Sequence, residues 1–403
     1  MLKLAFRNIF RHKTRTGLTL AVIIFGVMGL ILSGGFIEDI FIQLREATIH
    51  SRLGHIQVYK AGYTEVGRRN PYQFLLSDTG DRVEKLRHLP HVSDVMVRLN
   101  FSGLLNNGHA DLPIIGEGIE PAREMQLGSS LSIVAGRQLA AEDDYGILVG
   151  QGVAQALQLK PGDYLTLLAN TPDGALNSLE LEVVGAFRTF SRDFDSRAVR
   201  IPLTAAQELL DTGGVHSLVF SLDETGATGN IASLLKQRLS DEEFEVKTWF
   251  ELADFYSKTV DLYRRQFGVM QLIILIMVML SVTNSVNMAI YERTGEFGTL
   301  RALGDRKRDI FRLVLTENTL LGLLGGGLGV LLGCLLAWSI SGIGIPMPPP
   351  PNSEMGYTAY IRLVPHVIML ACVVGAMATI LAALWPAYRV SRLSVIEALR
   401  ANV

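Results

Sequence analysis

Few residues of this 403-residue chain combine the types and spacing that catalysis or metal binding requires. His88 and His91 flank Pro90 at a spacing that could serve a metal, yet no nearby cysteine or carboxylate pair completes a ligand set. The acids of AEDDYG (141–146) could do acid–base work, although an exposed acidic loop is the commoner structure. No G-x-x-x-x-G-K-[ST] run is present, so the chain lacks the P-loop that holds ATP phosphates. We therefore predict no catalytic residue, metal or cofactor in this chain.

The densest run of charge is ERTGEFGTLRALGDRKRD (292–309), which lies between two strongly apolar stretches. Its first part, 292–303, has the periodicity of a short amphipathic helix lying along a membrane surface. The apolar strip of that helix would consist of Phe297, Leu300 and Leu303.

The residues around this predicted helix indicate how it ends and what it meets. Gly304 can adopt the left-handed conformation that ends a helix, and Asp305 can cap the next one. Glu292 and Glu296 place acids where anionic lipid headgroups would repel them. We therefore expect a protein partner for this helix rather than lipid alone.

Four windows of the chain carry no Asp, Glu, Lys or Arg, and each is long enough to cross a bilayer as a helix of about 20 residues. They predict four transmembrane helices, at Thr16–Ile37, Gln266–Tyr291, Asn318–Ser353 and Leu363–Tyr388. Ion-coupled transporters usually keep ionisable residues inside the membrane, so these windows argue against a secondary transporter. His366, near the outer end of the fourth helix, is predicted to lie at the level of the headgroups.

Lysine and arginine in short flanks indicate the orientation, because positive flanks stay in the cytoplasm. The first fifteen residues, the 291–312 segment and the C-terminus are all basic, whereas the loop before the fourth helix has only Arg362. Both termini are therefore predicted to be cytoplasmic and residues 45–265 to be external. A basic flank before an apolar run also describes a cleaved signal peptide, but this run is longer than usual, so we expect a retained helix.

The third predicted helix has a face without side chains. Glycines recur there in two overlapping registers, Gly322 with Gly326, and Gly325 with Gly329 and Gly333. Such faces let a neighbouring helix approach closely. The face is expected to serve packing within the subunit, with a sliding or hinge surface as the alternative.

The external region reads as an α+β domain. GHIQVYK (54–60) and the helix, proline and strand of residues 81–99 form one βαβ unit, and residues 215–249 form a second. Two such units make a ferredoxin-like split sheet. The segment between them, about 100–214, carries turn signals at Asn107-Gly108 and Pro172-Asp173-Gly174 and is predicted to form a β-rich insertion.

Three stretches of the chain resemble FtsX-like permeases of the MacB or LolC/LolE type, within the type VII ABC transporters. ERTGEFGTLRALGDRKRDIFRLVLTENTLLGLLGG (292–326) is similar to the permease core with its coupling helix. PAYRVSRLSVIEALR (386–400) resembles the closing signature, with Val395 where proline is common, and LAFRNIFRHKTRTGLT (4–19) resembles the N-terminal segment. Residues 136–169 are similar to a segment of the external domain. The resemblance implies three parts. Residues 1–44 would form the N-terminal segment and first helix, residues 45–265 a periplasmic domain with Porter and Sabre subdomains, and residues 266–403 the permease domain.

The resemblance also implies a mechanism, in which a separate cytoplasmic ATPase dimer, with its ATP and magnesium, pushes on the coupling helices of two permease copies. A Gram-negative inner membrane follows from the family. The sequence leaves open whether the two copies are identical, and no nucleic-acid partner is expected. The residues matching the coupling segment are Glu292, Arg293, Glu296, Phe297, Gly298, Arg301, Ala302, Leu303 and Gly304.

Three activities remain open within the family. A lipoprotein-releasing permease would extract acylated proteins through an apolar cleft between paired subunits and pass them to a periplasmic chaperone. An exporter would expel drugs or peptides with an adaptor and an outer-membrane channel, and a regulator would only transmit force to a hydrolase or sensor. Because the chain has no ATPase motif, lipoprotein release is favoured. Residues that could line the cleft, although ordinary core is their commoner role, are Met28, Ile31, Met270, Ile274 and Met277.

Overall fold

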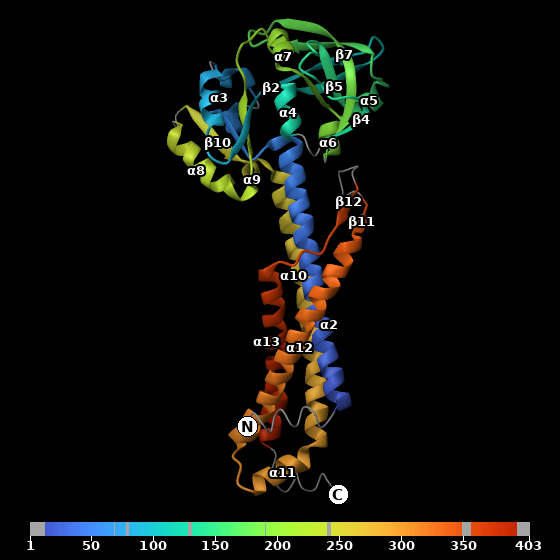
Figure 1. Cartoon of the computed structure of the whole chain (residues 1–403), viewed down its shortest axis with the longest axis vertical. Coiled ribbons are helices and arrows are strands. Elements are labelled where there is room, and N and C mark those ends of the chain that lie inside the picture. The colour runs from blue at the N-terminus through green and yellow to red at the C-terminus, as the bar shows by residue number, and fades with distance from the viewer. Residues whose placement is uncertain are drawn as a thin grey trace. The chain divides into compact units, whose positions relative to one another are not determined.

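The computed structural model describes residues 13–67, 69–77, 80–127, 131–189, 191–239, 243–348 and 356–392 (Figure 1). The described chain forms two compact units, a helical unit and an α+β unit, the latter consisting of Gln43–Thr259 and Pro348–Tyr357. Most of the N-terminal basic flank, and the closing signature beyond residue 392, lie outside the described residues.

Four helices are long and apolar enough to cross a membrane, which confirms the predicted number. Three of them start or end well outside their apolar windows, because apolarity marks only the stretch in lipid while the helix goes on in water. The predicted end of the third at Ser353 is wrong, because that helix ends at Ile343 and a short strand follows. Helices α2 and α10 have 36 and 39 residues, or about 54 and 58 Å of rise, against a hydrocarbon core of about 30 Å. The four are α2 (Lys13–Thr48), α10 (Asp254–Glu292), α12 (Lys307–Ile343) and α13 (Pro365–Ser391).

The helical unit has one core, formed by residues of all four long helices. Its members include Val27 of α2, Val282 of α10, Val314 of α12 and Ala378 of α13, all nearly inaccessible. The opposite helix faces carry exposed leucines and tryptophans, such as Trp338 at 73% exposure. That pattern suits helices whose outer faces contact lipid. A short two-stranded sheet, β11 (Ile345–Met347) and β12 (Tyr357–Ala359), lies in the chain between α12 and α13.

The α+β unit begins with a four-stranded sheet in the order β10-β1-β9-β2, all antiparallel. Helices α3 and α8 share one apolar cluster with these strands, so both pack on the same face. The two βαβ units predicted from sequence therefore interleave as a split sheet. Their elements are β1 (Ile56–Lys60), α3 (Gly80–Arg87), β2 (Val92–Asn106), β9 (Ser217–Leu222), α8 (Thr228–Arg238) and β10 (Phe244–Thr248).

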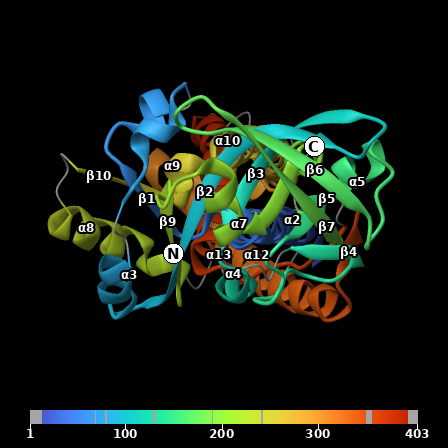
Figure 2. The same ribbon diagram turned by 90° about the horizontal axis from the view of Figure 1, so that it is seen from above.

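The strands between these two units close into a six-stranded barrel. The pairing runs β2-β3-β8-β5-β7-β6 and returns to β2. In Figure 2 the barrel strands lie to the right and helices α3 and α8 to the left. The turns predicted at 107–108 and 172–174 are confirmed as the hairpins β2-β3 and β6-β7. The strands are β3 (Asp111–Ile119), β5 (Gly146–Gly150), β6 (Tyr164–Asn170), β7 (Leu176–Arg188) and β8 (Ala198–Pro202), with β4 (Ser132–Gly136) paired to β7.

The barrel has an apolar core, and short elements complete this unit. The core includes Leu105, Leu167 and Val199. Helix α7 packs on that core through Ala206 and Leu209. The remaining elements are η1 (Ile49–Leu53), η2 (Tyr63–Gly67), η3 (Pro71–Phe74), α4 (Pro121–Leu127), α5 (Gln151–Ala156), α6 (Arg192–Asp195), α7 (Leu203–Leu210), η4 (Thr225–Ala227) and α9 (Trp249–Leu252).

Two buried histidines of the split sheet accept backbone hydrogen bonds. The backbone N–H of Asn100 donates to Nδ1 of His216 at 3.1 Å, and that of Leu222 donates to Nδ1 of His55 at 3.1 Å. Burial lowers the pKa of His216 to about 4, and burial followed by the field of His50 lowers that of His55 to about 4. Both rings are therefore neutral at pH 7, and the Nδ1 lone pair of each can accept the backbone hydrogen bond.

Acidification is expected to loosen these strands. A histidine whose folded pKa is depressed adds stability that is complete above the unfolded value of 6.5 and is lost as pH falls towards about 4. Hydrogen-exchange protection factors of the Asn100 and Leu222 amides in the full-length protein should fall across that window. His216→Asn keeps an acceptor that does not titrate, so it should flatten the pH dependence at Asn100 and leave that at Leu222. Protection that stays constant from pH 7 to 4 would contradict this expectation.

Candidate functional site

The charged segment singled out in the sequence forms a sharp double turn. Only Arg293 separates the end of α10 from α11 (Thr294–Ala302), which falls within the predicted range 292–303. The chain turns again at Gly304, where φ is 108°, so its predicted left-handed conformation is confirmed. The predicted cap at Asp305 is wrong, because α12 starts at Lys307 and Asp309 accepts the hydrogen bond of the Arg306 backbone N–H at 3.0 Å.

Arg293 fastens this double turn to α12. Its Nη1 and Nη2 donate to the carboxylate of Glu317 at 2.7 and 3.3 Å, and its Nε donates to Glu296 at 3.0 Å. The guanidinium also lies 5.1 Å from the ring centroid of Phe297. Arg293 and Glu317 are each only 8% exposed. A buried, bidentate arginine–carboxylate pair holds both helices in one geometry, so α11 and the start of α12 form one rigid piece.

The structure divides the predicted coupling residues between two directions. Phe297 is 3% exposed whereas Leu303 is 81% exposed, so the predicted apolar strip is wrong at its last position. The reason is that positions six apart lie about 120° apart on a helix with 3.6 residues per turn, so Leu303 falls outside the face that Phe297 buries. Arg293, Phe297 and Gly298 are buried, Glu296 and Arg301 are half-buried, and the exposed residues are Glu292, Thr299, Ala302, Leu303 and Gly304. We call these five the outward face of α11, although Glu292 ends α10, Leu303 and Gly304 follow α11, and Thr299 was not among the predicted coupling residues.

The glycines of α12 face two different helices. A Cβ at Gly325 or Gly329 would lie 2.8 Å from Ile23 or Val27 of α2, closer than real side chains approach. Gly333, in the same register, lies against Met28 and Ile31 of α2. The other register turns to α13, where a Cβ at Gly322 would clash with Thr379 and one at Gly326 would lie 3.8 Å from Cys372. Both registers therefore bring backbones together within the subunit.

A second ion pair in the helical unit has a buried acid on α2 and an exposed arginine before α13. Asp39 is fully buried, and Arg362 donates to it through Nε at 2.7 Å while the backbone N–H of Tyr360 donates at 2.9 Å. No sequence pattern pairs these residues, because both flank apolar windows and are far apart along the chain.

Of the five residues predicted for an acyl-chain cleft, Ile31 and Ile274 share one apolar cluster within the described chain. Met28 and Ile31 contact the glycine face of α12, and Ile274 packs on the core of the bundle. Met270 is half-buried, and Met277 is 63% exposed. A cleft between paired subunits stays a prediction, since it needs the second copy.

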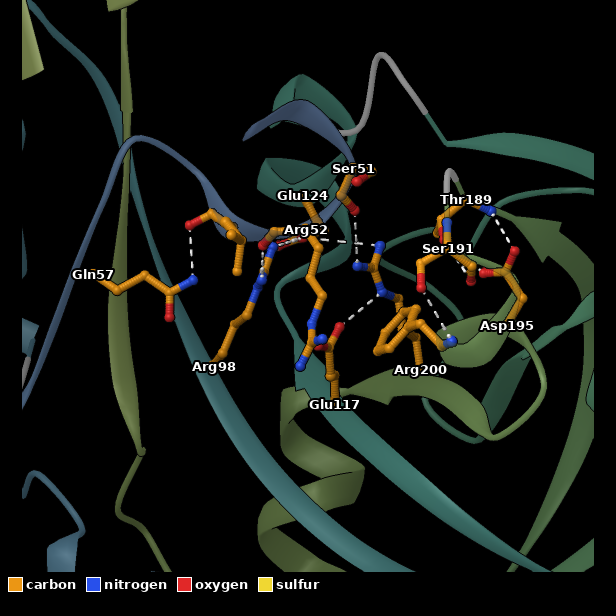
Figure 3. A network of polar contacts seen from close by, with 12 residues as sticks. Ser51, Arg52, Gln57, Arg98, Glu117, Glu124, Thr189, Ser191, Asp195 and Arg200 are labelled. Atoms are coloured by element: carbon orange, nitrogen blue, oxygen red, sulfur yellow. Dashed lines mark hydrogen bonds and ion pairs between the residues drawn. The ribbon is translucent and has the colours of Figure 1, made fainter. Parts of the chain in front are cut away.

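A cluster of buried charges joins the two sheets of the α+β unit (Figure 3). Arg98 of β2 pairs with Glu124 of α4, and Arg200 of β8 donates to Glu117 of β3 at 3.0 Å. Arg200 also lies 3.9 Å from Glu124. All four side chains are at most 6% exposed. We call these four residues the charge cluster.

The charge cluster holds the turn that follows α2. Arg200 donates to the backbone carbonyl of Ser51 at 3.3 Å, and Arg98 donates to that of Arg52. The Arg52 side chain pairs with Glu117 at 3.3 Å. Burial alone would raise the pKa of Glu117, but the field of Arg200, with those of Arg98 and Arg52, lowers it to about 2. The cluster is therefore charged at neutral pH, and it binds η1 to both the split sheet and the barrel.

Sequence reasoning missed the charge cluster, although a signal was present. Arg98 stands in VMVRLNF and Arg200 in AVRIPL. Each arginine is a single charge within an otherwise apolar run of the kind that forms a buried strand. Such a charge needs a buried partner. The partners could not be named, because Glu117 and Glu124 come from a strand and a helix whose positions only the fold defines.

Two family models together match most of the chain. The model of the MacB-like periplasmic core domain matches residues 16–238, more than half of the chain, and that of the FtsX-like permease C-terminal domain matches residues 268–395. The chain belongs to the FtsX-like permeases. The double turn of α11 therefore lies in the permease domain, and the charge cluster lies in the periplasmic core domain.

Relatives of this permease are ABC transporter proteins at low identity. An uncharacterised ABC transporter permease of Methanocaldococcus jannaschii is 25% identical over 98% of this chain and 96% of its own length. The lipoprotein-releasing system protein LolC of Neisseria meningitidis is 24% identical over 95% of this chain and 91% of its own. The macrolide export ATP-binding/permease protein MacB of Sodalis glossinidius is 27% identical over 99% of this chain and 60% of its own.

Proposed function

We propose that this permease works with a separate cytoplasmic ATPase dimer, which docks on the outward face of α11. The carrying observation is the exposure of Leu303, at 81%, directly after a helix whose other side is fixed by the buried Arg293–Glu317 pair. An exposed leucine at the end of a rigid, charged helix suits a protein contact better than water. ATP and magnesium belong to that partner.

Force applied to α11 would reach the membrane through α10 and α12. Arg293 links α11 to α12, and only that residue separates α11 from α10. Helix α10 is about 58 Å long, and it runs from the double turn to the periplasmic core domain. Helix α2 enters the same domain through the η1 turn held by the charge cluster. Closure of the ATPase would therefore move both long helices of each permease copy, and with them the periplasmic domains.

Lipoprotein release from the outer leaflet is the substrate activity we propose. Similarity to LolC over 95% of the chain supports it, together with the periplasmic core domain. In this proposal the protein lies in the inner membrane with both termini cytoplasmic and pairs with a second permease copy. The split sheet would be the Porter subdomain and the barrel the Sabre subdomain. A periplasmic chaperone would accept the lipoprotein.

Copurification tests docking and substrate together. Leu303→Arg should abolish recovery of the ATPase with the full-length permease, because a buried, unpaired arginine is costly at an interface. Leu176→Arg is the matched control, since Leu176 is also exposed, at 68%, but lies in the periplasmic core domain. Mass spectrometry of the wild-type complex should find triacylated lipoprotein that leaves on addition of ATP.

The outcomes separate the two parts of the proposal. Equal recovery of the ATPase with both leucine variants would place the docking contact elsewhere. Recovery of the ATPase without acylated ligand would retain docking and exclude lipoprotein release.

A further inference from the structure

A cavity of about 500 Å³ lies between α2, α10 and α13 in the helical unit. Its volume is in the range of about 300–1,000 Å³ that is typical of small-molecule sites. Most of its lining is apolar, and its polar members are Glu38, Arg264, Gln271 and His366. None of the five residues predicted for an acyl-chain cleft lines it.

The charged and titratable lining residues lie towards the helix ends nearest the periplasmic core domain, and the lining inward of them is apolar apart from Gln271. Helix α13 starts at Pro365, and the ends of α2 and α10 nearest the periplasmic core domain are Thr48 and Asp254. Glu38, Arg264 and His366 are therefore the outermost charged or titratable groups of the cavity on their three helices. The lining continues inward to Leu30, Leu275 and Val374. That distance is about 12–16 Å at 1.5 Å per residue, close to half of a hydrocarbon core of about 30 Å.

The polar groups at the cavity lack partners of their own. Among the residues that the structure describes, the side chains of Glu38, Gln271 and His366 make no hydrogen bond or ion pair. The Arg264 guanidinium lies 5.8 Å from the ring centroid of Phe41, another lining residue. Glu38 is half-buried and Arg264 is exposed, and charged groups that face lipid are costly unless they are paired. An occupant that brings both a negative and a positive charge would satisfy Glu38 and Arg264 together.

The cavity is separate from the exposed face of α2. Leu18 and Phe25 are 65% and 66% exposed, as expected where a second permease copy or lipid packs. Gly34, which lines the cavity, lies on the opposite face from Phe25, because positions nine apart differ by about 180° at 3.6 residues per turn. The cavity therefore belongs to one subunit.

We propose that this cavity binds one acyl chain of a zwitterionic glycerophospholipid of the outer leaflet, with its phosphate on Arg264 and its ammonium on Glu38. The acylated cysteine of a lipoprotein carries neither charge and would leave both side chains unpaired. The apolar lining from Ile37 to Leu275 encloses the chain. This site does not depend on the ATPase or on the transported substrate, so it stands even if the proposed function fails.

Native mass spectrometry of the full-length permease, titrated with phosphatidylethanolamine, tests the headgroup contacts. Arg264→Gln removes a charge-assisted hydrogen bond and should weaken binding by about tenfold or more. Arg265→Gln is the matched control, since Arg265 is the neighbouring exposed arginine and does not line the cavity. Glu38→Gln should abolish the preference for phosphatidylethanolamine over phosphatidylglycerol.

Two glycine-to-leucine variants, one that fills the cavity and one control, test the acyl-chain contact. A Cβ at Gly268 meets no atom within 4 Å, so Gly268→Leu should fold and occupy the cavity. Gly327→Leu is its control, because Gly327 of α12 is equally open and lies outside the cavity. Lipid retention should be lost in the first variant alone, with both variants keeping the wild-type melting temperature or a higher one.

Three results would overturn the proposal. Lipid retention that is unchanged in Arg264→Gln and Gly268→Leu would show that the cavity is not the site. Tighter binding of phosphatidylglycerol in the wild type would exclude a zwitterionic headgroup. If Gly268→Leu displaced an acylated protein and not a phospholipid, the cavity would belong to the transported substrate.

Discussion

Replacing Arg200 with methionine is expected to lower the free energy of unfolding of the periplasmic core domain by about 3–5 kcal/mol. The side chain is 2% exposed, and its removal leaves Glu117 and Glu124 with less positive charge around them. It also frees the carbonyl of Ser51. Urea unfolding of the full-length protein in detergent measures the loss, with the buried Trp249 as reporter after Trp338→Phe and Trp385→Phe.

Two further variants distinguish the buried charge from a general effect of losing an arginine. Arg137→Met removes the exposed partner of Asp143, whose pair should contribute less than about 1 kcal/mol. Glu117→Met in the Arg200→Met background removes an uncompensated charge and should recover part of the loss. A cost for Arg200→Met no larger than that for Arg137→Met would show that the charge cluster does not stabilise the domain.

Substituting leucine for Gly329 is expected to separate α12 from α2 and to destabilise the helical unit by about 1–3 kcal/mol or more. A Cβ there would lie 2.8 Å from Val27 and 3.2 Å from the backbone carbonyl of Ile24, and a carbonyl on a helix cannot move aside as a side-chain tip can. Gly327→Leu, two residues away and open, adds the same side chain without a clash. Thermal unfolding of the detergent-solubilised pair measures the difference.

The same pair of variants decides between the two uses of the glycine face. If the face serves close packing within the subunit, the melting temperature of the Gly329→Leu variant should be well below that of the Gly327→Leu variant. Equal melting temperatures with reduced ATP-driven transport would instead support a face that slides during the cycle.

The sequence predicted the membrane helices well, because a charge-free apolar window of about 20 residues rarely occurs outside a membrane span. It also predicted the split sheet, whose strands and helices follow local periodicity. The closed barrel escaped prediction because its pairings β2-β6 and β3-β8 join distant segments, and one of them is parallel. No local pattern encodes which strand lies beside which.

The position of the candidate site along the chain was predictable, but the direction in which its side chains point was less so. The resemblance located the coupling segment, and glycine chemistry located its turn at Gly304. The charge pattern and the resemblance together suggested that Arg293 faces a partner, whereas Glu317 of α12 draws it inward. An arginine and a glutamate that lie 24 residues apart are recognisable as a pair only when the helices that carry them are placed.

The place of β9 in the split sheet bears on the order in which the chain is made. Strand β9 lies between β1 and β2, yet it is synthesised after every strand of the barrel. Until residues 217–222 emerge, β1 and the first half of β2 have unpaired edges, while the barrel already has all its partners. The barrel can therefore close first. The split sheet closes last, when a late strand enters between two early ones, and slow steps of this kind are where exposed edges invite misassembly.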